Sequence, residues 1–154
     1  MRKLNLPVVV NVTTTLDLGG AQIIALELAK ATAKSGFRSF LISGKGGKLS
    51  EVVSGKRDSF QWIVVPHLAR EIHPIDDIRA LAELYYLFRY RLKPVIVHTH
   101  TSKAGILART AARFAGVPVI IHTVHGWSFH VGHSRIANFT FKTLERFTAT
   151  FTTR

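Results

Sequence analysis

The fold is decided by the stretch Val95-Ile-Val-His-Thr-His-Thr-Ser-Lys-Ala-Gly-Ile106. It begins as an apolar, β-branched strand and then changes into a polar tip of His, Thr, Ser and Lys. The stretch Val119–His130 repeats this pattern, because Val-Ile-Ile leads into His-Thr-Val-His-Gly-Trp-Ser-Phe-His. Parallel α/β sheets place their ligand sites at the carboxyl ends of the strands. We therefore expect a parallel sheet with a site built from these two tips.

Strand and helix patterns alternate along the whole chain. Strands are expected at Leu6–Val12, Phe37–Ser43, Phe60–Val65, Pro94–His98 and Val117–His122. Helices are expected at Ala21–Ser35, Leu49–Ser54, from Pro74 to the basic residues Arg89–Lys93, Ser102–Ala115 and Ser134–Arg146. The helix from Pro74 should bury Ile78, Leu81, Tyr85 and Phe88, and Phe147–Arg154 resembles the start of a sixth strand. This alternation indicates an α/β fold with a doubly wound parallel sheet and right-handed crossovers.

Composition indicates one globular domain with an anionic partner. The chain has 154 residues, of which 47% are hydrophobic and 19% charged, and it has no cysteine and a net charge of +12. An excess of this size favours nucleic acid, an acidic membrane surface or a phosphorylated substrate. No run of eighteen apolar residues is present, so no bilayer span is expected. The amino-terminal segment is interpreted as a first strand, which places the protein in the cytoplasm.

The loop Asp17-Leu-Gly-Gly-Ala-Gln22 follows the first strand and precedes a helix. The paired glycines Gly19 and Gly20 would let backbone N–H groups approach a phosphate at the positive end of that helix. An ordinary strand-to-helix turn that needs glycine would have the same sequence. The three spaced glycines of the dinucleotide fingerprint are missing, so NAD is disfavoured.

Histidines gather at both strand tips. His98 and His122, inside the strands, are expected to be buried and hydrogen-bonded, whereas His100 and His125 are the better site candidates. A metal site is disfavoured, because no cysteine or carboxylate lies among these histidines and no pair has the helical i, i+4 spacing.

Lys103 lies in the first turn of the helix that Thr101 or Ser102 should cap. A cation there opposes the helix dipole unless an anion is close by. We take this charge as an indication of a phosphate or carboxylate ligand.

The helix Ser134–Arg146 is basic and amphipathic. It either packs on the sheet or makes a peripheral contact with an anionic membrane. Trp127 and Phe129 form either a small satellite core or an apolar wall for a ligand. The alternative function is therefore a non-catalytic basic module that binds anionic membrane or nucleic acid. Nucleic acid is not expected, because a basic stripe interleaved with aromatics is missing.

Three of these segments resemble a known family. Asp17–Gln22 resembles the Gly-Gly-Ala-(Glu/Gln) loop of family 4 glycosyltransferases, and the tips His98–Arg109 and His122–His130 are similar to its next two signatures. The resemblance covers essentially the whole chain, and it is nearest to the enzymes of bacterial surface polysaccharide synthesis. It implies the Rossmann-like amino-terminal, acceptor-side domain of a two-domain retaining enzyme.

The resemblance also implies roles for single residues. Gly19 and Gly20 would approach the donor phosphates, His125 would contact the transferred sugar, and His100, Thr101, Ser102 and Lys103 would line the acceptor side. The substrates implied are a nucleotide-sugar and a glycan or lipid-linked acceptor, with no metal and no cofactor. The family's carboxyl-terminal donor domain is missing, so we expect residues 1–154 to be a single domain that is truncated at its carboxyl end and inactive alone.

Overall fold

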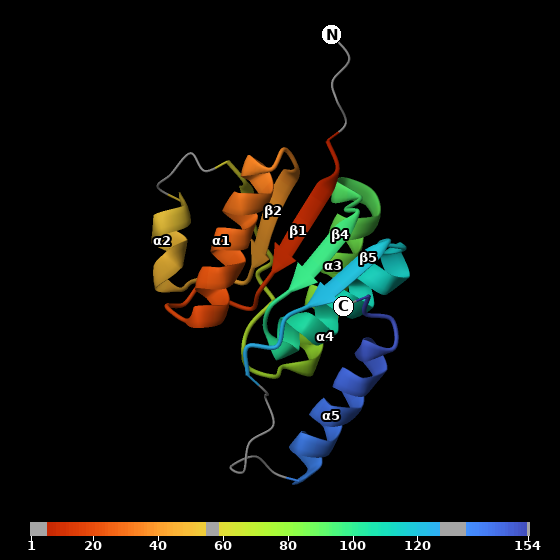
Figure 1. Cartoon of the computed structure of the whole chain (residues 1–154). Coiled ribbons are helices and arrows are strands. Elements are labelled where there is room, and N and C mark those ends of the chain that lie inside the picture. The colour runs from red at the N-terminus through yellow and green to blue at the C-terminus, as the bar shows by residue number, and fades with distance from the viewer. Residues whose placement is uncertain (1–5, 55–58, 127–134, 154) are drawn as a thin grey trace.

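A computed structural model describes residues 6–54, 59–126 and 135–153. Five parallel strands form its central sheet (Figure 1). They are β1 (Val8–Val12), β2 (Arg38–Ser43), β3 (Gln61–Val64), β4 (Ile96–Thr99) and β5 (Val119–His122). Their order across the sheet is β3-β2-β1-β4-β5, so that the chain moves outward from β1 in one direction and then returns to place β4 on the other side of β1.

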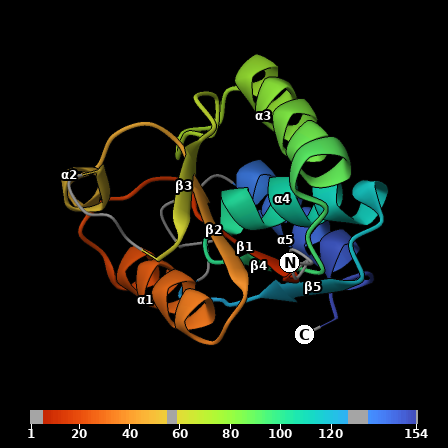
Figure 2. The ribbon, with the colours of Figure 1, turned by 90° about the horizontal axis from the view of Figure 1, so that it is seen from above.

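Helices cover both faces of this sheet. They are α1 (Gly20–Lys34), α2 (Lys48–Ser54), α3 (Pro74–Tyr86), which continues into the π-helical segment η1 (Leu87–Leu92), α4 (Ser102–Ala115) and α5 (Arg135–Ala149). Figure 2 shows α1 on one side of the sheet and α3 and α4 on the other. The doubly wound parallel sheet predicted from the alternating pattern is confirmed.

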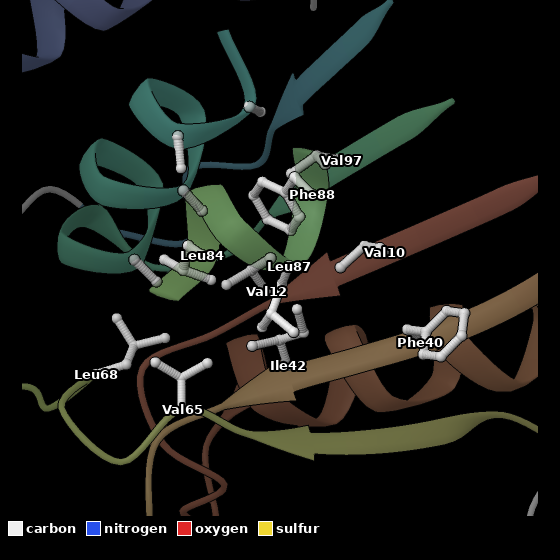
Figure 3. Close-up of a cluster of buried hydrophobic side chains, with 14 of the residues drawn as sticks. Val10, Val12, Phe40, Ile42, Val65, Leu68, Leu84, Leu87, Phe88 and Val97 are labelled. Atoms are coloured by element: carbon white, nitrogen blue, oxygen red, sulfur yellow. The ribbon is translucent and has the colours of Figure 1, made fainter. Parts of the chain in front are cut away.

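The alternation of side chains along β1 divides the core in two. Val8, Val10 and Val12 belong to a cluster with residues of α3, η1 and α4, and Figure 3 shows Val12 beside Leu87 and Phe88 beside Val97. A second cluster, which includes Leu26 and Leu41, lies under α1. Because successive strand residues point to opposite faces, Asn11 lies on the α1 side of the sheet. This places a buried amide on that face of the sheet, one residue before the end of β1 and beside His98 of β4.

The predicted core face of α3 is rotated in the structure. Ile78 is 68% exposed, whereas Ala80, Leu84, Leu87 and Phe88 are buried. Leu81 and Tyr85 lie at the rim of the buried face. At 100° per residue, position 78 falls just beyond that rim, although its spacing from 81 and 85 fits a helical stripe. The prediction that Ile78 is buried is therefore wrong, because its position lies just outside the buried face of the helix.

The predicted sixth strand is also wrong. Helix α5 continues to Ala149, because the threonines in this stretch are accommodated by hydrogen bonds to helical carbonyls, such as Thr148 Oγ1 to Leu144 O at 2.9 Å. β-Branched residues would otherwise favour a strand. Of the described residues in this stretch, up to position 153, Thr153 alone pairs with β5, since its N–H donates to the Ile120 carbonyl at 2.7 Å. Within the described residues, no helix is long and apolar enough to cross a bilayer.

Candidate functional site

The order of the strands creates a crevice between β1 and β4. These neighbours are followed by α1 and α4, which leave toward opposite faces of the sheet, so the two connecting loops diverge. Open α/β sheets bind ligands at this point. The structure has a cavity of about 840 Å³ here, which we call the switch-point cavity.

All seven residues predicted for the site line this cavity. They are Gly19, Gly20, His100, Thr101, Ser102, Lys103 and His125. Sequence reasoning missed Arg70, Glu71 and Ile72, which reach the cavity from the segment after β3. No motif marks that segment, and only its position after the end of a strand could have indicated it.

Helix α1 presents its amino terminus to the cavity. Gly19 is its N-cap residue, has an extended backbone and makes no side-chain cap. A Cβ built on Gly19 would lie 2.6 Å from Gln22 Oε1, whereas a Cβ on Gly20 meets no atom within 4 Å. The first-turn N–H groups are therefore not covered by a capping side chain, and the helix dipole makes this end attractive to an anion.

Helix α4 presents a second amino terminus without a side-chain cap. The predicted cap by Thr101 does not form. Instead, the Thr101 hydroxyl accepts from the Thr14 N–H at 3.3 Å and lies 3.4 Å from Thr14 Oγ1, and so joins the tips of β4 and β1. The α1 and α4 termini therefore both face one cavity.

Lys103 has an anionic partner within the chain. Its ammonium lies 2.5 Å from Asp77 Oδ1 and also donates to the Glu71 carbonyl. The positive charge in the first turn of α4 is thus balanced by Asp77 on α3, and it does not by itself require a ligand. The predicted contact between Lys103 and the acceptor stays a prediction.

The four strand-tip histidines form one cluster. His100 is fully buried, with Nε2 3.1 Å from Asn11 Oδ1 and Nδ1 3.4 Å from His125 Nε2. The His98 ring lies 4.2 Å from the His100 ring, centroid to centroid. His100 and His125 both line the cavity, but His100 is fully buried whereas His125 is exposed. His100 is therefore enclosed in the wall of the cavity, behind the exposed ring of His125.

His98 and His122 are hydrogen-bonded, as expected, and partly buried. His98 Nε2 lies 2.7 Å from Thr123 Oγ1. His122 Nδ1 lies 2.8 Å from Thr99 Oγ1. Among the described residues, no group of three or more His, Cys, Asp or Glu side chains is arranged to hold a metal ion.

Burial keeps three of these histidines neutral. It lowers the pKa of His100 to about 3, helped by the neighbouring His98, His125 and His122. It lowers the pKa of His98 to about 4, with a smaller effect of His125. The pKa of His122 is about 4, lowered by burial and by the Arg109 charge and partly restored by its hydrogen bond with Thr99.

These shifts predict that the fold is sensitive to acid. Since the unfolded imidazoles titrate near pH 6.5 and the folded ones near 3 to 4, protons bind preferentially to the unfolded state between these values. Stability should therefore be constant above about pH 7 and fall as the pH drops toward 4. Denaturant titrations at pH 7.5 and 5 would measure this fall. His98→Gln should reduce it, and the exposed His73→Gln should not; equal stability at both pH values would contradict the prediction.

The remaining sequence predictions for the site fall partly outside the described residues. Trp127 and Phe129 lie there. The part of α5 whose side chains are described keeps Phe139, Leu144 and Phe147 exposed. Packing of this helix on the rest of the domain therefore leaves much of its apolar surface uncovered.

Comparisons with known proteins identify the family and the fold. Residues 18–154 match the family described as Glycosyltransferase Family 4. The chain is 40% identical over 137 residues to the Escherichia coli UDP-Gal:alpha-D-GlcNAc-diphosphoundecaprenol alpha-1,3-galactosyltransferase. That match covers 89% of this chain and 34% of the enzyme, so the chain spans about a third of its relative's length.

Two solved structures share the fold. HepE of Anabaena, in complex with UDP, superposes with a TM-score of 0.64 at 11% identity, covering 96% of this chain and 36% of that one. A UDP-N-acetylglucosamine 2-epimerase superposes with a TM-score of 0.57 at 18% identity, covering 96% and 38%. At these identities the likeness concerns the fold alone.

Proposed function

Because this chain belongs to glycosyltransferase family 4, we propose that it forms the acceptor-side half of a retaining glycosyltransferase. The reaction is the transfer of a hexose from a nucleotide-sugar to a lipid-linked glycan in bacterial surface polysaccharide synthesis. The relative's name supports a UDP-sugar as donor and a sugar on diphosphoundecaprenol as acceptor. The observation that carries the proposal is the convergence of two helix amino termini without side-chain caps and His125 on one cavity.

This convergence fits the charges of such substrates. A nucleotide-sugar and a diphospholipid-linked acceptor each carry a diphosphate, and each helix amino terminus favours one anion. We assign the Gly19–Gly20 end of α1 to the donor and the Thr101–Lys103 end of α4 to the acceptor. His125, at the cavity surface between them, then contacts the sugar that is transferred.

Transfer also needs stabilisation of the departing nucleoside diphosphate. Such stabilisation comes from positive groups arranged in advance around the leaving group. The family resemblance assigns these groups to a second, donor-binding domain. We propose that the present chain binds its acceptor without that domain. It transfers sugar only when the domain is supplied. Its place is the cytoplasmic face of the membrane, where a lipid-linked acceptor can be reached.

The test joins this chain to the part of the Escherichia coli galactosyltransferase that lies beyond the matched region. We expect labelled galactose to pass from UDP-galactose to GlcNAc-diphosphoundecaprenol with the fusion and not with the chain alone. A folded fusion that binds both substrates and transfers nothing would overturn the proposal.

A glycine variant tests the donor assignment in the same fusion. Gly20→Val adds its side chain to open space, so the fold should persist while the approach of the phosphate is blocked. The KM for UDP-galactose should rise about tenfold or more, as expected for a lost charge-assisted hydrogen bond. Ser35→Ala, at the other end of α1, is the matched control. An unchanged KM for UDP-galactose would show that the donor does not bind at the amino terminus of α1.

A further inference from the structure

An apolar groove of about 260 Å³ lies beside the switch-point cavity. Ile106 and Leu107 of α4 form its floor, and Phe141 and Leu144 of α5 and Ile72, just before α3, complete its apolar lining. The ribbon in Figure 1 places α4 between α3 and α5, so the groove runs along α4. Helix packing normally closes such a space with side chains from both neighbours.

The groove and the cavity are continuous. Ile72, Lys103 and Phe141 line both. A ligand in the cavity can therefore extend into the groove past the first turn of α4 without crossing another element.

The groove exposes large apolar side chains to solvent. Ile72 is 58% exposed and Leu144 is 38% exposed. Exposed apolar surface next to a polar cavity is typical of a ligand groove, because an apolar partner regains the free energy of burial there. The site thus has an apolar part and a polar part side by side.

The boundary between the two parts holds the ion pair of Lys103 and Asp77, both of which line the groove. The Lys103 ammonium also donates to the Glu71 carbonyl. The amino terminus of α4, which has no side-chain cap, lies at the same place and favours an anion. An amphiphile with an anionic head and an apolar tail matches this arrangement, with its head at the first turn of α4 and its tail along Ile106 and Leu107.

We propose that this groove binds the isoprenoid units of the acceptor lipid that are nearest to the diphosphate. The proposal rests on the proposed function, since it supplies the binding site for the apolar part of that acceptor. The diphosphate lies against Lys103 and the first turn of α4, and the prenyl chain runs between α4 and α5. The enzyme then selects lipid-linked acceptors by the chain as well as by the sugar.

The test measures binding of inorganic diphosphate and of dimethylallyl, geranyl and farnesyl diphosphate to the chain by titration calorimetry, below micellar concentrations. Affinity should rise with chain length, by about tenfold per isoprene unit while the groove is being filled, because each added apolar carbon is withdrawn from water. Equal affinities for all four ligands would overturn the proposal.

Two variants in the groove and one outside it make the test specific. Ile106→Asn and Leu144→Asn should weaken farnesyl diphosphate at least tenfold and leave inorganic diphosphate unchanged, since both side chains line the groove and not the switch-point cavity and neither change adds a charge. Phe114→Asn is the matched control, because Phe114 is 72% exposed on α4 and does not line the groove. Equal losses in all three variants would show general surface hydrophobicity and contradict a groove.

Vesicles separate the lipid-linked acceptor from the bilayer itself. We expect the groove variants to lose binding only to phosphatidylglycerol vesicles that contain undecaprenyl diphosphate. An equal loss with vesicles without it would make the groove a bilayer contact and overturn the proposal. The transfer assay is independent of these measurements. If the fusion transfers galactose at a rate that does not depend on prenyl length, the proposed function is supported and the proposed role of the groove is wrong.

Discussion

Replacing His125 with alanine should slow galactose transfer by about 10²- to 10³-fold, the loss expected when one preorganised polar group is removed from a reacting centre. The measurement is kcat in the fusion that carries the donor-binding part. The KM values should change little, because the proposed contact of His125 gains strength in the transition state. A rise in KM of the same size, with no fall in kcat, would show that His125 contributes to substrate binding only.

The buried residues beneath His125 orient its imidazole. We propose that His100 Nε2 carries the proton, because Asn11 Oδ1, which can only accept, lies 3.1 Å away, and that His100 Nδ1 accepts from His125 Nε2–H. This leaves Nδ1 of His125 as the nitrogen that can meet a sugar hydroxyl. The second nitrogen of a histidine commonly sets the role of the first in this way.

Changes at Asn11 test this orientation without touching the substrate. Asn11→Leu should give a kcat between those of the wild type and His125→Ala, because the tautomer of His100 is then no longer fixed by a hydrogen bond to residue 11. Asn11→Asp keeps an acceptor but adds a negative charge, which raises the pKa of His100 from its value of about 3. Activity should then fall at a higher pH on the acid side than in the wild type. A purely structural role for Asn11 would lower stability and leave the pH profile in place.

The second large effect is expected at Arg109. Its side chain is 2% exposed, and its guanidinium donates to Glu145 Oε2 at 2.5 Å and to the Gly105 carbonyl at 2.9 Å. Arg109→Leu should lower the free energy of unfolding by about 3–5 kcal/mol, because it leaves the Glu145 carboxylate largely buried without its partner. Urea denaturation followed by circular dichroism measures this loss.

A double variant identifies the cause. Arg109→Leu combined with Glu145→Leu should recover most of the loss, since neither charge then remains buried. The exposed Arg113→Ala, on the same helix, should change the free energy of unfolding by less than about 0.5 kcal/mol. If the double variant is no more stable than Arg109→Leu, the bonds to Gly105 and Thr152, and not the ion pair, hold α4 and α5 together.

The residues that orient His125 and the Arg109–Glu145 ion pair belong to different parts of the fold, although the Arg109 charge also lowers the pKa of His122. The Asn11–His100–His125 line runs from β1 through the tip of β4 to the cavity, whereas Arg109 joins α4 to α5 on the other face of the sheet. Effects of the two sets of variants should therefore add. Their sum gives a direct check on whether the site and the α4–α5 contact are independent.

The sequence by itself determined the sheet and the location of the site. Apolar runs such as Val8–Val12 can be buried only in a sheet covered on both faces, and their polar tips must then meet at one edge. That pattern puts the seven candidate residues at one edge of the sheet, whereas the roles proposed for them come from the resemblance to the family. Even the bounds of α4 agree with the prediction, because Thr101 and Gly116 end it for local reasons of backbone geometry.

What the sequence did not determine depends on partners that are distant along the chain. Lys103 indicated an anion, but only packing of α3 on α4 shows that Asp77 supplies one. His100 was expected at the cavity surface, and the register of β4 beside β1 instead buries it against Asn11. The groove likewise exists only because α5 packs beside α4. Periodicity describes one element at a time, whereas burial, charge pairing and cavities arise between elements, so they were decided by the tertiary structure alone.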